Sequence, residues 1–108
     1  VREVVASVVG VSQMLSAATI AELVSGQFRV SLEDLRSRSR KRAVAFPRQV
    51  AMYLARKYTE ESLVDIGRTF NRDHSTVLHA IKSVGSQVLR DASISAQVEI
   101  LAGKVKQL

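Results

Sequence analysis

The sequence predicts an all-α fold, and three observations support that prediction. Apolar residues recur every three or four positions along most of the chain, as they do on the buried face of a helix. No stretch alternates apolar and polar residues, which is the pattern of a half-buried strand. The chain has 108 residues, 46% of them hydrophobic, with one proline and no cysteine. We therefore expect one small helical domain with a modest core and neither disulfides nor cysteine-bound zinc.

The first two predicted helices lie near the N-terminus. Residues 2–9 carry a stripe of valines that ends at Gly10. Residues 17–28 form a second helix with Ser16 as its N-cap. The residues expected to face inward on this second helix are Ile20, Leu23, Val24 and Phe28.

A short helix and a basic loop come next. Ser31 is the expected N-cap of a helix that ends at Leu35, and Asp34 at the third helical position makes it resemble a capping box. Residues 36–42, RSRSRKR, have no apolar face and would repel one another on a helix. We expect them to form a loop or a ragged helix end.

A long amphipathic helix is predicted over residues 44–58. Its expected inner face consists of Val44, Val50, Ala51, Leu54 and Tyr58. Pro47 falls in the opening turn of this predicted helix, where its missing N–H does little harm.

The last three predicted helices have recognisable N-caps. Ser62 caps a short helix through Phe70, and Asp73 caps a longer one that ends near Arg90. The buried side of the longer helix carries Val77, Ile81, Val84 and Val88. Ser93 is the expected N-cap of a final helix over residues 94–107. Its buried residues would be Ile94, Val98, Leu101 and Val105.

The positive charge of the chain is concentrated in its centre. Net charge is +6, but residues 36–82 contain eleven basic and four acidic residues, whereas the two flanks together are slightly acidic. Such a concentrated field suggests a polyanionic partner. The apolar runs are broken well before the ~18 residues that a membrane span needs, so we expect no span.

Asp73, His74 and Ser75 raise the possibility of a hydrolytic triad, which their spacing rules out. Consecutive residues on a helix diverge by about 100°, so these three side chains cannot line up as acid, base and nucleophile. His74 and His79 are five positions apart, unlike the i, i+4 histidines of a zinc helix. The chain also lacks a phosphate-binding loop and a dinucleotide fingerprint. We predict no catalytic residue, no metal and no cofactor, and therefore no enzyme.

The same residues fit a DNA-reading role. The segments SLVDIGRTF, NR and DHSTVLHAIKSV form a short helix, a tight turn and a longer helix, which is the helix-turn-helix layout. In that layout the first turn of the second helix enters the major groove. Carboxylate, imidazole and hydroxyl groups can hydrogen-bond to base edges there.

One stretch, residues 38–80, resembles the C-terminal DNA-binding domain of the bacterial replication initiator DnaA: RSRKRAVAFPRQVAMYLARKYTEESLVDIGRTFNRDHSTVLHA. The matching signature residues are Ile66, Gly67, Arg72, His74, Ser75, Thr76, Val77, Leu78 and Ala80. The resemblance implies a Trp-repressor-like helix-turn-helix bundle of about six helices that binds double-stranded DNA at the nine-base-pair DnaA box. We expect this domain to occupy residues 16–108, after an N-terminal helix or connector over residues 1–15.

The resemblance also implies a set of DNA-binding residues. Those that would read bases in the major groove are Asp73, His74, Ser75 and Thr76. Arg40 would enter the adjacent minor groove. Those that would contact the phosphate backbone are Arg48, Gln49, Arg56, Leu63, Val64, Arg72 and His79.

Three functions remain open at this point. The first is replication initiation in the bacterial cytoplasm, at the nucleoid, with ATP bound only through a separate domain of the parent protein, if any. The chain begins with Val and has no signal-peptide cleavage pattern, so we read it as a fragment of a longer protein. The second is the DNA-targeting domain of a transposase or transcriptional repressor, because residues 1–15 differ from the usual DnaA connector. The third is a helical interaction domain whose basic loop binds an acidic protein.

Overall fold

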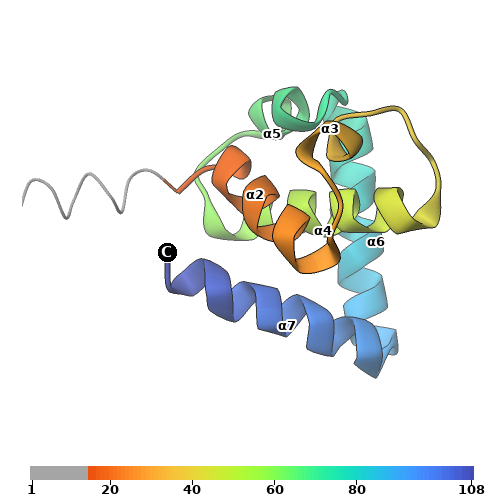
Figure 1. Cartoon of the computed structure of the whole chain (residues 1–108), viewed down its shortest axis with the longest axis vertical. Coiled ribbons are helices and arrows are strands. Elements are labelled where there is room, and N and C mark those ends of the chain that lie inside the picture. The colour runs from red at the N-terminus through yellow and green to blue at the C-terminus, as the bar shows by residue number, and fades with distance from the viewer. Residues whose placement is uncertain (1–14) are drawn as a thin grey trace, which may run out of the picture.

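The computed structural model describes residues 15–108, which form six α-helices and no strand (Figure 1). The helices are α2 (Ala17–Phe28), α3 (Leu32–Leu35), α4 (Arg42–Tyr58), α5 (Leu63–Phe70), α6 (His74–Arg90) and α7 (Ala92–Lys106). The all-α prediction is confirmed. The helix predicted over residues 2–9 lies outside the described residues.

Four helices begin where a capping side chain predicts. Ser16, Ser31, Ser62 and Asp73 each accept a hydrogen bond from the backbone N–H three residues later. Each side chain satisfies one of the donors that the first helical turn leaves without a carbonyl partner. The polar residue before each apolar stripe therefore fixes where the helix starts.

The start of α7 differs from the prediction. Its N-cap is Asp91, not Ser93, and the Asp91 carboxylate accepts from the N–H groups of Ser93 and Ile94 at 2.9 and 3.2 Å. The N–H of Asp91 also donates to the Gln87 carbonyl at 2.8 Å and so closes α6. A carboxylate has enough acceptor sites for both N–H groups. Asp91 alone therefore joins α6 to α7.

The position of Pro47 within α4 was also wrong in the prediction. The helix begins at Arg42, so Pro47 is its sixth residue and lies beyond the opening turn. Lys41 precedes the helix without a side-chain cap, and its carbonyl accepts from the N–H groups of Val44 and Ala45. Because proline has no N–H, the carbonyl of Ala43 loses its usual i+4 donor.

Helix α4 lies at the centre of the fold and contacts each of the other five helices. In Figure 1 it crosses the molecule behind α2, while α6 runs steeply on one side and α7 lies beneath. The largest fully buried side chains are Phe70, Ile20, Leu35, Met52, Leu54, Ile66 and Leu101. The rings of Phe28 and Phe46 meet edge to face, with centroids 5.9 Å apart, and join the end of α2 to the start of α4.

Most predicted core positions are buried, although some only in part. On α4, Val50, Ala51 and Leu54 are buried, whereas Val44 and Tyr58 keep partial exposure. On α6 the fully buried valines are Val77 and Val84, while Ile81 and Val88 pack at the edge of the core. All four residues predicted for α7 are buried: Ile94, Val98, Leu101 and Val105. Helix α6 therefore packs against the core with one face and exposes the opposite face to solvent.

Candidate nucleic-acid interface

The turn between α5 and α6 is tight and requires two particular residues. Asn71 adopts the left-handed conformation, with φ 59° and ψ 46°, and ends α5. The N–H of Arg72 then donates to the Gly67 carbonyl at 2.8 Å. A Cβ placed on Gly67 would collide with the backbone carbonyl oxygen of Arg72. Glycine therefore lets the backbone before α6 pass directly against α5.

The tip of α6 presents four polar side chains to solvent. Asp73, His74, Ser75 and Thr76 are all exposed, while Val77 behind them is fully buried. The Asp73 carboxylate accepts from the Thr76 N–H and from the Ser75 hydroxyl, both at 2.9 Å. These bonds, the one from the Thr76 backbone above all, lower the pKa of Asp73, so the carboxylate is charged at neutral pH. The tip thus offers a fixed anion, an imidazole and two hydroxyls.

The geometry of the tip agrees with the absence of a hydrolytic triad there. The Ser75 hydroxyl donates to Asp73 rather than to His74. A triad needs the histidine between the acid and the nucleophile, with a hydrogen bond to each. Residues 15–108 also contain no group of three or more His, Cys, Asp or Glu placed to hold a metal ion.

A basic loop, residues 36–41, connects α3 to α4 and carries exposed arginines. Arg36, Arg38 and Arg40 are all exposed. Within residues 15–108 the single ion pair is Arg68 with Asp65, at 3.2 Å, so no carboxylate of this region neutralises the loop arginines. Sequence reasoning singled out Arg40 and left Arg36 and Arg38 aside, although the arginine run itself was a signal for them.

Arg48 lies beneath this loop and not on the surface. Only 5% of its surface is exposed, and its guanidinium donates to four backbone carbonyls. These carbonyls belong to Leu35 (2.7 Å), Ser39 (3.0 Å), Asp34 (3.1 Å) and Ser37 (3.0 Å). A guanidinium has five N–H donors, so one is left. This arrangement gives Arg48 an interior role and does not favour the predicted phosphate contact.

Arg72 links the basic loop to the tip of α6. Its guanidinium donates to the Ser37 carbonyl at 2.7 Å and to the Asn71 carbonyl at 3.1 Å. Ser37 is 35 positions away in sequence, so this bond brings two distant segments together. Burial first, and then the positive charge of Arg72, lowers the pKa of Arg48, whose guanidinium nevertheless remains charged. The loop that carries Arg40 therefore lies beside the start of α6.

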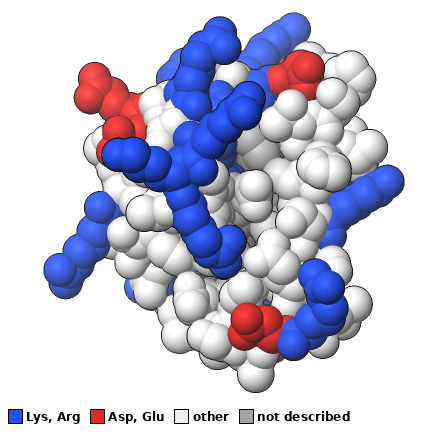
Figure 2. Space-filling model, turned by 90° about the vertical axis from the view of Figure 1, so that its right-hand side faces the viewer, with Lys and Arg blue, Asp and Glu red and all other residues white. Residues whose placement is uncertain are grey.

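The face that includes this loop is rich in basic side chains. Figure 2 shows Lys and Arg side chains gathered over its upper and central part, with acidic side chains toward its edges. The concentration of positive charge expected from the sequence is thus also a concentration in space. A surface of this kind attracts a polyanion such as duplex DNA.

The other predicted phosphate contacts lie on α4, α5 and α6. Gln49 is partly exposed, and Arg56 and His79 are exposed. Leu63 and Val64 form the first turn of α5, where their backbone N–H groups have no acceptor within residues 15–108. A helix N-terminus with free N–H groups can hold a phosphate, so apolar residues can serve here through their backbone.

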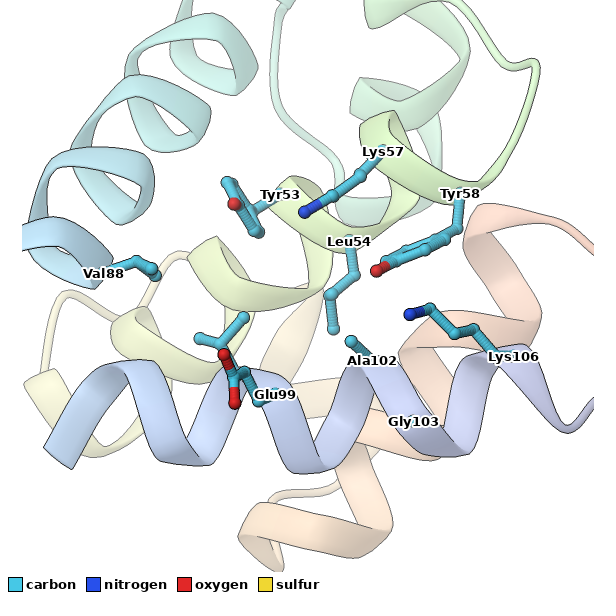
Figure 3. Close-up of a pocket in the computed structure, with 10 residues that line it drawn as sticks. Tyr53, Leu54, Lys57, Tyr58, Val88, Glu99, Ala102, Gly103 and Lys106 are labelled. Atoms are coloured by element: carbon cyan, nitrogen blue, oxygen red, sulfur yellow. The ribbon is translucent and has the colours of Figure 1, made fainter. Parts of the chain in front are cut away.

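A pocket lies apart from the predicted DNA-binding residues, none of which lines it. It is formed by the C-terminal part of α4, the C-terminal part of α6 and the face of α7 opposite them (Figure 3). Lys57 extends between Tyr53 and Tyr58, with its ammonium 5.8 and 5.7 Å from the two ring centroids. Glu99 and Lys106 lie on its α7 side. This pocket is not part of the candidate interface.

Within residues 15–108, no helix has the length and apolar character that crossing a bilayer requires.

Comparison with known proteins identifies the family. A family model described as "Bacterial dnaA protein helix-turn-helix" matches residues 17–84. The chain is 58% identical over all 108 residues to the "Chromosomal replication initiator protein DnaA" of Desulfotalea psychrophila, covering 22% of that protein. It is 49% identical over 105 residues to the protein of the same name from Desulfatibacillum aliphaticivorans, covering 97% of this chain and 23% of that protein. A third relative of that name, from Caldanaerobacter subterraneus, is 44% identical over 87 residues, which are 81% of this chain and 20% of that protein.

The chain thus spans about a fifth of the length of these relatives. The predicted DnaA-type helix-turn-helix domain, as opposed to an enzyme, is confirmed by the family match. The chain belongs to the DnaA family, and residues 17–84 are its helix-turn-helix region.

Proposed function

We propose that this domain binds double-stranded DNA sequence-specifically at DnaA-box sites. Base readout in the major groove is assigned to the α6 tip, and Arg40 enters the adjacent minor groove. The observation that carries this proposal is the exposed tip, which lies beside an exposed arginine loop and is tied to it by the Arg72–Ser37 hydrogen bond. The residues of the tip are Asp73, His74, Ser75 and Thr76.

Phosphate contacts flank the bases in this proposal. The side chains involved are those of Gln49, Arg56, Arg72 and His79. Leu63 and Val64 contribute through their backbone N–H groups at the start of α5. We assign Arg48 a supporting role instead, because four of the five N–H donors of its guanidinium are engaged with carbonyls of the protein.

The biological role we propose is recruitment of a longer protein to a replication origin at the nucleoid, in the bacterial cytoplasm. The relatives are named chromosomal replication initiators, and the Desulfotalea psychrophila protein aligns with every residue of this chain. That full alignment includes residues 1–15 and favours an initiator over a transposase or repressor. ATP is bound only by a separate domain of the longer protein, if it is bound at all.

A salt-resolved binding assay tests the proposal. The domain is titrated by fluorescence anisotropy into a duplex that carries a DnaA box and into a scrambled duplex of the same composition. We expect the box to bind about 10³-fold more tightly, at the lower end of the usual range for specific over non-specific binding. Equal affinity for the two duplexes would reject sequence-specific recognition, and absence of binding to either would favour an acidic protein partner.

A further inference from the structure

The basic loop needs external support if Arg40 is to occupy a fixed position. Within the loop, hydrogen bonds are short-range: the Ser37 hydroxyl donates to the Asp34 carbonyl at 2.7 Å, and the Ser39 N–H donates to the Ser37 hydroxyl at 3.2 Å. Residues 36–41 place three exposed arginines close together. Their mutual repulsion favours a spread of conformations over a single one.

Arg48 supplies the first support. The loop curves around its guanidinium so that four carbonyls between Asp34 and Ser39 point at one buried cation. These are charge-assisted hydrogen bonds, which are about twice as strong as neutral ones. Arg48 belongs to the central helix α4, so it holds the loop against the most buried element of the fold.

Arg72 supplies the second support. The Ser37 carbonyl accepts from Arg48 at 3.0 Å and from Arg72 at 2.7 Å. Arg72 immediately precedes Asp73, the N-cap of α6. A continuous path of hydrogen bonds therefore runs from α4 through one loop carbonyl to the residue beside the DNA-reading tip.

We propose that Arg48 and Arg72 are positioning residues that set the spacing between Arg40 and the tip of α6. Through this spacing they determine which separation of minor-groove and major-groove sequence the domain accepts. The inference rests on the proposed function, because it takes Arg40 and the tip as the two DNA-reading elements.

A double-mutant cycle measures the coupling between Arg40 and Arg48, which share no hydrogen bond. In the wild-type background, Arg40→Ala should weaken binding to a DnaA-box duplex roughly tenfold, the loss expected for one specific contact. In an Arg48→Lys background the same substitution should weaken binding less than about twofold, because Arg40 is no longer held in place. Equal effects in the two backgrounds would overturn the inference.

Arg56→Lys is the matched control for Arg48→Lys. Arg56 lies on the same helix but is exposed, and its one hydrogen bond within residues 15–108, to the Glu61 carbonyl, is 3.4 Å long. In the Arg56→Lys background, Arg40→Ala should retain its full tenfold effect. A cycle with Arg56 that is as non-additive as the one with Arg48 would also count against the inference.

A duplex with altered spacing gives a readout that loss of stability alone would not change. One base pair is inserted between the minor-groove and major-groove segments of the site. Wild-type protein should bind this altered duplex much more weakly than the unaltered one. For Arg48→Lys and Arg72→Lys, the ratio of affinity for the unaltered duplex to affinity for the altered duplex should be at least several-fold smaller than for the wild type. A ratio equal to that of the wild type, with overall weaker binding, would mean that the two arginines only stabilise the fold.

Trypsin cleavage supplies a measurement that does not depend on DNA. Trypsin cuts after arginines such as Arg36, Arg38 and Arg40, and a loop that is fixed in one conformation is cut slowly. Arg72→Lys, which removes a single long-range bond from a half-buried side chain, should make cleavage there several-fold faster. Unchanged cleavage rates in both Arg72→Lys and Arg48→Lys would reject the support role.

If the wild type shows no preference for the box, the proposed function itself fails, whereas an additive cycle with a preserved preference rejects only this inference.

Discussion

Asp73 serves two purposes with one side chain. Its carboxylate caps α6 through the Thr76 N–H, accepts from the Ser75 hydroxyl and still lies at the exposed tip of the helix. An acceptor fixed in this way can discriminate between bases that offer an amino group and those that do not. The cap also makes the stability of α6 depend on the charge of this residue.

We expect the stability that Asp73 contributes to disappear in acid. The Thr76 backbone bond, followed by the Ser75 hydroxyl, holds its pKa below the ordinary value in the folded state. A group of this kind stabilises the fold above its unfolded pKa, and the contribution is lost as pH falls through the folded pKa. Asp73→Asn provides a cap that does not titrate. The Tm advantage of wild type over this variant, followed by circular dichroism, should therefore shrink below the ordinary carboxyl range, and an advantage that is constant with pH would contradict the assignment.

Thr76 permits a test of base readout. Its exposed hydroxyl can be removed by Thr76→Ala without loss of the α6 cap, because the cap uses the backbone N–H of residue 76. Discrimination between box and scrambled duplexes should fall by about 1–3 kcal/mol, with non-specific binding nearly unchanged. Ser86→Ala, which removes another exposed hydroxyl farther along α6, should leave discrimination intact. An unchanged specificity ratio would remove Thr76 from the reading residues.

At the scale of helices, the sequence predicted boundaries well where a capping side chain marks them. Ser16, Ser31 and Ser62 fixed the starts of α2, α3 and α5 because each precedes an apolar stripe and can accept from its first turn. The start of α4 was missed by two residues, since Lys41 provides no such side chain. At α7 the prediction named Ser93, whereas the carboxylate of Asp91, two residues earlier, is the cap.

The α5–α6 turn depends on Gly67 in a way that a single substitution can test. Gly67→Ala places a methyl group against the Arg72 backbone carbonyl, which cannot rotate away as a side chain would. Overpacking of this kind typically costs about 1–3 kcal/mol, measurable as a lower urea midpoint with unchanged slope. The displaced α6 tip should also lose box preference.

Gly26→Ala is the matched control for that substitution. Gly26 lies within α2, and nothing comes within 4 Å of a Cβ placed there. The substitution should stabilise the protein by up to about 1 kcal/mol, the difference in helix propensity between the two residues. Equal destabilisation by the two glycine substitutions would show that the close approach at Gly67 is unimportant.

At the scale of the whole molecule, the sequence predicted the charge distribution and the fold class but not the use of each arginine. A run of basic residues before a helix-turn-helix indicates a polyanion partner whichever of them faces the ligand. The burial of Arg48 and the Arg72–Ser37 bond depend on contacts between segments up to 35 positions apart. Hydrophobic periodicity and capping patterns are local, so neither could have revealed them.

The salt dependence of binding should report how many DNA phosphates the exposed side chains contact. The logarithm of affinity falls with the logarithm of salt concentration in proportion to the phosphates neutralised, and Arg56→Ala should reduce that slope by about one. Arg90 lies at the far end of α6 from the tip, so Arg90→Ala should leave the slope unchanged. Both slopes come from anisotropy titrations at several ionic strengths. A reduction for Arg90 equal to that for Arg56 would mean that the DNA-facing side has been misplaced.

The single-residue joint at Asp91 makes this domain intolerant of length changes between its last two helices. Asp91 both closes α6 through its N–H and caps α7 through its carboxylate, so insertion of one residue there would divide these two roles between different residues. It would also shift Ile94, Val98 and Leu101 relative to the core residues against which they pack. Natural or engineered sequences that keep this architecture should therefore vary in length beyond Lys106 long before they gain or lose a residue at position 91.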